Sequence, residues 1–372
     1  MMKNLFFFTT AFLIGQFFLL AQTVTTFTEG TPDDGIALDS NGNIYCSNYT
    51  GDTVFKFTPT GEMTPFITGL NTPNGLAFNS NQELYVCDGQ GNTIYKYDID
   101  GNLLNSYPIA GHPSGIVKSI DDESMIFTLY QGNAVKKLAA DGSITDVSTA
   151  AELSGPVGIV YDATGNLYVG NYNNRIIYKV LGNGDLEYIA QLPTQGGSFP
   201  NLGFISYGQG KLWGTVMSNH KIYAINPNSV DDYQIYAGST QGNEDGDIAT
   251  ATFNVPNGIY FEETEGTLYV TDFGSKNLRI ISGVSLGNDE FKKEITSFYI
   301  LPNPAENTFE IQFQNDLFSK VDVKIYDELG KLVLEKRNHT TAEKIDISTL
   351  KRGVYLIEIT TEKGKFCKKL VK

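Results

Sequence analysis

The sequence predicts an all-β protein whose main domain is a six-bladed β-propeller. A proline followed shortly by a glycine recurs six times, and the successive glycines lie 40, 40, 43, 45 and 55 residues apart. Each copy holds up to four short apolar stretches separated by polar turns. A fixed period near 40 residues with four strands per unit is the signature of a propeller blade. The six glycines are Gly35, Gly75, Gly115, Gly158, Gly203 and Gly258.

The chain begins with a segment typical of secretory signals. A short basic start precedes an apolar run over residues 5–20, which ends at Ala21. This pattern predicts a signal peptide over residues 1–21. The alternative is a membrane anchor, but Gln16 interrupts a run already shorter than the ~20 residues that a span needs. We expect no transmembrane span in the mature chain.

The charge is concentrated in the repeat domain. Residues 1–285 carry 12 basic and 28 acidic side chains, whereas residues 286–372 carry 15 and 14. The negative field of this domain repels phosphate backbones and attracts cations. It excludes nucleic acid as a partner and is compatible with a bound divalent cation, for which Ca²⁺ is the first candidate.

The three cysteines do not form a disulfide framework. Cys46 and Cys87 stand one position out of step in their strands, so we expect their side chains to point to opposite faces. Both are predicted to be buried free thiols.

Within each copy, the glycine opens an inner strand, as in residues 75–78, and a second strand follows after a polar turn, as in residues 84–86. A third strand comes next, as in residues 94–97, and a shorter fourth strand closes most copies, as in residues 63–67. Copy six ends near Ile281 without a fourth strand, whereas residues 23–27 belong to no copy. We expect this N-terminal strand to complete the last blade, which closes the ring and protects its edges.

The repeat resembles the NHL family of six-bladed propellers. The best-matching stretch runs through residues 237–272 and includes Gly242, Gly246, Pro256 and Gly258. The resemblance implies a six-bladed NHL-type propeller over residues 22–285.

The C-terminal part follows a different pattern. Residues 286–297 are predicted to be a linker, and residues 298–372 alternate in a way that predicts a small immunoglobulin-like β-sandwich. The Pro302-Asn303-Pro304 start, the Leu350-to-Tyr355 segment and the basic end resemble the type A C-terminal sorting domain of the type IX secretion system of Bacteroidetes. The resemblance implies export through that machinery, cleavage of the domain, and a propeller that is released or attached to the cell surface. The alternative is an adhesive immunoglobulin-like module.

The residues just before each repeat glycine are the first candidates for a site. Inner strands line the central channel of a propeller, so these side chains should form a ring at one mouth. Their carboxylate and amide oxygens suit Ca²⁺, although Asn and Asp before Gly are also ordinary turn residues. The ring is Asp34, Asn74, Ser114, Val157, Asn201 with Leu202, and Asn257.

A second resemblance concerns the gluconolactonase and senescence-marker-protein family, carried by Asn201, Asn257, Asp34 and the strand over residues 212–217. It implies one divalent ion held by Asp34, Asn201 and Asn257, with Asp34 as the carboxylate for proton transfer. Ser114 stands where the family has a fourth, glutamate ligand. This is the alternative function, a metal-dependent lactonase or esterase-like hydrolase.

Aromatic residues past the second strands suggest a binding surface instead. Aromatic rings with polar neighbours on loops bind carbohydrates and peptides, although such rings also pack between blades. The sequence therefore favours a binding module for a protein, peptide or glycan, exported to the surface or released. Its candidate ligand-binding residues are Asn74, His112, Tyr49, Tyr130, Tyr172 and Phe273.

Overall fold

The computed structural model describes residues 22–30, 32–196, 201–284, 298–313, 320–327, 330–341, 343–361 and 364–372. The predicted signal peptide at residues 1–21, the predicted linker at residues 286–297 and Pro200 lie outside the described residues. The chain divides into two compact units, at residues 1–284 and 285–372.

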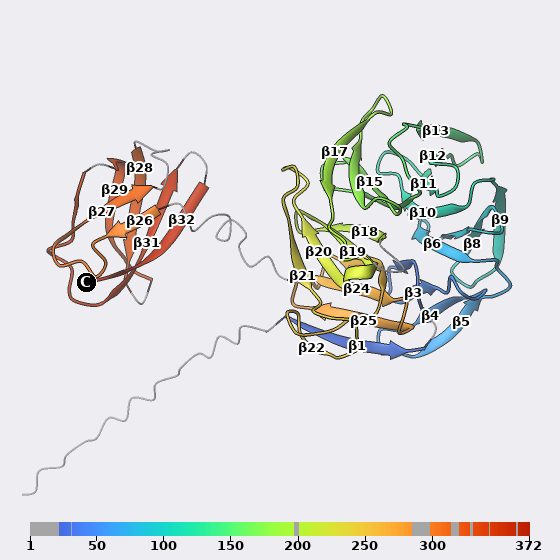
Figure 1. Ribbon diagram of the computed structural model, residues 1–372, viewed down its shortest axis with the longest axis horizontal. Helices are drawn as coiled ribbons and strands as arrows, with labels where there is room; N and C mark the ends of the chain where they lie inside the picture. Colours follow the sequence, from blue (N-terminus) through green and yellow to red (C-terminus); the bar gives the residue numbers. More distant parts are fainter. Residues whose placement is uncertain are drawn as a thin grey trace, which may run out of the picture. The chain divides into compact units, whose positions relative to one another are not determined.

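The first unit is a six-bladed β-propeller, as predicted (Figure 1). Blades one to five are four-stranded antiparallel sheets with the strands in chain order. Their strands are β2 (Ile36–Leu38), β3 (Ile44–Ser47), β4 (Val54–Phe57) and β5 (Met63–Ile67); β6 (Pro73–Phe78), β7 (Leu84–Asp88), β8 (Thr93–Tyr97) and β9 (Leu103–Pro108); β10 (Pro113–Lys118), β11 (Met125–Leu129), β12 (Ala134–Leu138) and β13 (Ile144–Ser148); β14 (Pro156–Tyr161), β15 (Leu167–Asn171), β16 (Ile176–Val180) and β17 (Leu186–Gln191); β18 (Leu202–Gly208), β19 (Lys211–Val216), β20 (Lys221–Ile225) and β21 (Tyr233–Ala237).

The sixth blade confirms the predicted closure. It contains β23 (Pro256–Glu262), β24 (Thr267–Asp272) and β25 (Asn277–Ser282), and β1 (Thr23–Glu29) pairs antiparallel with β25. A two-residue strand that the sequence did not predict, β22 (Gly246–Asp247), pairs with the other edge of β1. The N-terminal strand is therefore held on both edges.

The repeat glycines allow the inner strands to approach closely. A Cβ atom on Gly75 would lie 2.2 Å from the carbonyl oxygen of Ser114, and one on Gly258 would lie 2.0 Å from that of Asp34. Any side chain would clash with the backbone of the next blade, so the channel requires glycine here. Hydroxyl groups add to this contact, since Thr271 Oγ1 donates to the Asp34 carbonyl oxygen at 2.6 Å.

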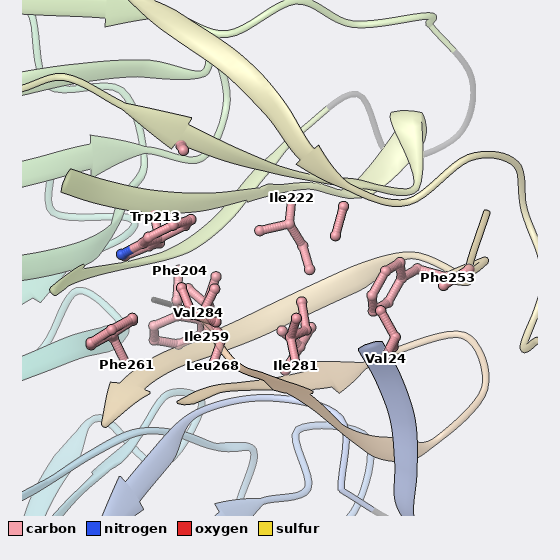
Figure 2. Packing of buried hydrophobic residues seen from close by; sticks show 14 of the residues in the cluster. Val24, Phe204, Trp213, Ile222, Phe253, Ile259, Phe261, Leu268, Ile281 and Val284 are labelled. Atoms are coloured by element: carbon pink, nitrogen blue, oxygen red, sulfur yellow. The ribbon is translucent and has the colours of Figure 1, made fainter. Parts of the chain in front are cut away.

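Apolar faces of neighbouring blades form the core (Figure 2). Between blades five and six, the rings of Trp213 and Phe261 stack with centroids 5.8 Å apart, close to Leu268 and Ile281. Cys46 and Cys87 are buried free cysteines, as predicted, and burial raises the pKa of both thiols. Within the described chain, the one helical turn is the 3₁₀ segment at Met217–Asn219, and no helix is long and apolar enough to span a membrane.

The second unit consists of two β-sheets. One contains β26 (Phe298–Leu301), β27 (Thr308–Phe313) and β30 (Ile345–Asp346), and the other contains β29 (Leu332–Thr340), β28 (Lys320–Tyr326), β31 (Val354–Thr361) and β32 (Gly364–Val371). Residues of both sheets, such as Phe309 and Ile357, belong to one buried cluster, which makes the unit a sandwich. Its immunoglobulin-like character stays a prediction.

Candidate functional site

One position of the repeat lies at the same face of the propeller in every blade. In blades two to six this position follows the residue that pairs with the first residue of the inner strand, as Tyr130 follows Leu129, the partner of Pro113. In blade one, Tyr49 stands three residues after Cys46, the partner of Ile36, just as Gly89 stands three residues after Val86, the partner of Leu76. Because all inner strands begin at this face, the position recurs around one channel mouth. Its occupants from blade one to blade six are Tyr49, Gly89, Tyr130, Tyr172, Met217 and Phe273.

Three of these residues and one histidine form a continuous row of rings, which we call the mouth cluster: Tyr49, His112, Tyr130 and Tyr172. Ring centroids lie 6.2 Å apart for Tyr49 and His112, 5.6 Å for His112 and Tyr130, and 5.7 Å for Tyr130 and Tyr172. His112 is buried, whereas the three tyrosines are half-buried. The structure therefore brings together four of the six residues predicted to bind a ligand.

Gly89 explains why a histidine takes part in this row. In blade two the repeat position lacks a side chain, and a Cβ atom there would lie 2.6 Å from Nε2 of His112. The imidazole of blade three thus fills the space that an aromatic residue of blade two would need. Burial lowers the pKa of His112, which favours the neutral ring.

Two neighbouring carboxylates lie at the same mouth. Asp34 is buried, and its Oδ1 accepts a hydrogen bond from Asn257 Nδ2 at 2.8 Å. Asp33 is also buried; it accepts from the backbone N–H of Tyr49 at 2.6 Å and forms an ion pair with Lys276. Burial, and then the charge of Asp33, raise the pKa of Asp34.

The charge of Asp34 contributes to the raised pKa values of two tyrosines of the mouth cluster. Burial and then the charge of Asp34 raise the pKa of Tyr49. Burial, followed by Tyr130, Tyr49 and Asp34, raises the pKa of Tyr172 to about 12. The hydroxyls of Tyr49 and Tyr172 therefore stay protonated at neutral pH and can donate hydrogen bonds.

The remaining polar residues of the predicted ring have different environments. Asn74 is buried, with Nδ2 3.4 Å from Ser114 Oγ, while its Oδ1 has no hydrogen-bond partner. Asn201 is half-buried and donates from Nδ2 to the backbone oxygen of Tyr172 at 3.3 Å. Of the three predicted metal ligands, Asn257 contacts Asp34, and Asn201 bonds elsewhere. The described part of the chain contains no group of three His, Cys, Asp or Glu residues suited to a metal ion.

Phe273 belongs to a separate contact on blade six. The Nζ atom of Lys276 lies 4.3 Å from the centroid of the Phe273 ring and also pairs with Asp33. Sequence reasoning missed Gly89, Asp33 and Lys276. Aligning the blades on the second strand would have revealed Gly89 as the gap in a row of aromatic residues, whereas Asp33 and Lys276 are 243 residues apart and meet only through ring closure.

Comparisons with known proteins fit this architecture. Residues 14–268 match the virginiamycin B lyase family, which is more than half of the chain. The chain belongs to the virginiamycin B lyase family. Residues 299–372 match the secretion system C-terminal sorting domain. Comparison with curated proteins gives no match.

Solved structures similar to the chain share its fold. Virginiamycin B lyase from Staphylococcus aureus is 17% identical, with 70% of this chain and 98% of that chain covered and a TM-score of 0.53. A gluconolactonase from Xanthomonas campestris is also 17% identical, over 70% and 89% of the chains, with a TM-score of 0.54. An auxiliary nutrient binding protein from Bacteroides thetaiotaomicron is 15% identical, over 70% and 76%, with a TM-score of 0.60. At these identities the likeness shows the fold alone.

The sorting domain determines where this member of the family goes. It indicates secretion by the type IX system to the cell surface or the extracellular space, as predicted. The secretion machinery is therefore a partner of residues 298–372.

Proposed function

We propose that this protein is an exported binding module whose ligand site is the mouth cluster. The observation that carries the proposal is the convergence of four rings from three blades on one channel mouth, beside a buried carboxylate. Half-buried tyrosines offer apolar faces for stacking and hydroxyls for hydrogen bonding. The ligand is a protein, peptide or glycan group that inserts at the channel mouth.

Asn74 supports a role in recognition. Its Oδ1 is buried without a partner, and such an acceptor typically costs about 1–3 kcal/mol in a folded protein. A ligand that donates a hydrogen bond to this oxygen would recover that energy. The solved nutrient binding propeller from Bacteroides thetaiotaomicron gives a precedent for binding by a protein of this fold.

The proposal is tested by screening the chain without its predicted signal peptide, residues 22–372, on glycan and peptide arrays. We expect retained ligands whose signal falls at least ten-fold for the double variant Tyr130→Ala, Tyr172→Ala. The control is Tyr95→Ala, which removes a half-buried tyrosine from the third strand of blade two. Equal retention by the double variant would place the site elsewhere.

Catalysis at the same mouth is the second candidate function. Membership in a family named for a lyase favours it, as does the contact between Asn257 and the buried Asp34. In this candidate function, Asp34, Asn201 and Asn257 would hold one divalent ion, for which Ca²⁺ is the first candidate. The ion would polarise a lactone or ester carbonyl, and Asp34 would transfer the proton.

Thermal melting separates this candidate from simple binding. A ligand of the folded state raises the melting midpoint. The midpoint of the EDTA-treated protein should rise with added Ca²⁺, Mg²⁺, Mn²⁺ or Zn²⁺ and should not rise for Asp34→Ala if an ion occupies the channel. No rise with any of the four ions would remove the metal-dependent hydrolase.

A further inference from the structure

We propose that the mouth cluster selects ligands that carry an ammonium or quaternary ammonium group. This inference rests on the proposed binding function and names the chemical class of the ligand. It draws on the balance of charge at the mouth, the arrangement of the rings and a contact inside the protein that uses the same chemistry.

The mouth contains two buried acidic groups and one ammonium partner. Asp33 and Asp34 are adjacent and buried, and Lys276 forms its ion pair with Asp33. Asp34 receives one hydrogen bond from the neutral amide of Asn257, and no ion pair involving Asp34 occurs in the described residues. A buried carboxylate is stable as an anion only beside a compensating charge or several donors, so burial favours the protonated form of Asp34 in the free protein. A bound cation would supply the charge that stabilises the Asp34 carboxylate.

The rings of the mouth cluster are suited to the same kind of ligand. The faces of tyrosine rings attract cations, and rows of aromatic rings bind quaternary ammonium groups. The Tyr130 and Tyr172 planes meet at 89°, and the His112 and Tyr130 planes at 63°. In these T-shaped contacts the edge of one ring lies against its neighbour, so successive rings turn their faces in different directions. The neutral form of His112, favoured by its burial, would not repel a cation.

Blade six already contains the arrangement that we infer for the ligand. Phe273 occupies the repeat position that Tyr49, Tyr130 and Tyr172 occupy in their blades. There the ammonium group of Lys276 lies over the Phe273 ring and pairs with Asp33. The mouth cluster offers tyrosine rings and Asp34 in the corresponding roles, and the cation would come from the ligand.

Asn74 gives an independent indication of a ligand. Asn74 is 4% exposed and is the second residue of the neighbouring inner strand, and its unpartnered Oδ1 can only accept hydrogen bonds. A primary ammonium group donates up to three hydrogen bonds. The buried carboxyl group of Asp34 and the unpartnered Oδ1 of Asn74 thus both favour a positively charged donor.

The test is a calorimetric titration of the mature chain with choline and with 3,3-dimethyl-1-butanol, which has the same shape without the charge. We expect choline to bind at least ten-fold more tightly than the neutral alcohol. Equal binding of the two compounds, or no binding of choline at millimolar concentration, would overturn the inference. This comparison uses the unaltered protein, so it does not depend on the folding of any variant.

Two variants identify the groups responsible. Asp34→Asn keeps an oxygen for Asn257 and removes the charge, so choline affinity should fall about ten-fold while that of the neutral alcohol stays the same. Tyr130→Ala should weaken both compounds. If choline does not bind, while binding of uncharged array ligands requires Tyr130 and Tyr172, the cation preference is wrong and the binding function stands. If array binding also ignores these tyrosines, both proposals fail.

Discussion

Gly89 contributes to the channel mouth because it has no side chain. It leaves space in blade two, and the imidazole of His112 occupies that space between Tyr49 and Tyr130. His112 itself has a φ of 62°, and its backbone N–H donates to Asn92 Oδ1 at 3.1 Å. This left-handed backbone conformation, held by the hydrogen bond, sets the direction in which the His112 side chain leaves the backbone.

A methyl group at position 89 should therefore disrupt the row of rings. We expect Gly89→Ala to push the His112 ring aside and to weaken ligand binding about ten-fold. The cost in folding free energy should stay near 1 kcal/mol, because the clash is with the far end of a side chain. Array binding and urea unfolding of this variant provide the two measurements. His112→Ala combined with Gly89→Ala is the control, since the added methyl then has no ring to displace.

Asp34 gives a prediction for the pH dependence of stability. Its pKa in the folded protein is raised above the ordinary 3.8, so above pH 4 the folded state keeps a proton that the unfolded chain releases. The free energy of unfolding therefore falls as the pH rises through this window, by up to about 1.4 kcal/mol per pH unit. Asp34→Asn should reduce this slope in urea titrations between pH 4 and 7.

Asp88 and Asp272 also have raised pKa values and contribute to the slope equally in both proteins. The difference between the slopes of the two proteins therefore reports on Asp34 alone. Identical slopes would mean that Asp34 is ionised in the folded protein and already has a compensating partner.

At this scale the sequence predicted the residue types of the site better than their partners. The repeat position of Tyr49, Tyr130 and Tyr172 follows from periodicity, and so does their common face. Periodicity carries no information about which side chain crosses from one blade into the space of another, as His112 does. It also says nothing of pairs formed by closure, such as Asp33 with Lys276.

At the scale of elements, the closing strand is held from two sides. β1 pairs with β25 on one edge and β22 on the other. Asp245, beside β22, accepts from the backbone N–H and the hydroxyl of Thr26 at 3.0 and 2.9 Å, and it pairs with Arg279 at 2.8 Å. Arg279 is fully buried, so its charge depends on these partners.

Removing Asp245 should therefore loosen the closed ring. We expect Asp245→Ala to lower the free energy of unfolding by about 2 kcal/mol, less than for a fully buried pair because Asp245 is half exposed. Urea unfolding measures this change. Asp247→Ala is the matched control in the same loop, because the Asp247 side chain is exposed. Equal stability of the two variants would show that backbone pairing alone holds β1.

The closure by β1 was predictable because copy six lacked a fourth strand and the first strand lacked a blade. The strand β22 was not, because two residues are too few to show an alternating pattern and the 55-residue interval between the fifth and sixth repeat glycines could equally hold a plain loop. The burial and pairing of Arg279 could not be predicted for a related reason. Three of its partners, Glu244, Asp245 and Thr252, lie in that interval, outside the regular period.

At the scale of the whole molecule, the chain combines a β-propeller with a sorting domain. The period near 40 residues was enough to predict the first unit, and the residues from 298 onward predicted the second. The two units have separate hydrophobic cores. Loss of the second unit should therefore affect transport and leave the propeller folded.

A chain that ends at residue 284 tests this separation. In a cell with a type IX system, we expect the full chain at the surface or in the medium and the truncated chain within the cell envelope. Fractionation followed by immunoblotting measures the distribution. The melting midpoint of the purified truncated protein should match that of the propeller in the full chain. Surface exposure of the truncated chain would show that export does not need the sorting domain.

The most direct test of the ligand site is hydroxyl-radical footprinting of residues 22–372 with the strongest ligand from the arrays. We expect oxidation of Tyr49, Tyr130 and Tyr172 to fall on ligand addition, whereas that of Tyr95 should not change. Unchanged oxidation of the three mouth tyrosines, with protection elsewhere on the propeller, would contradict the assignment of the site.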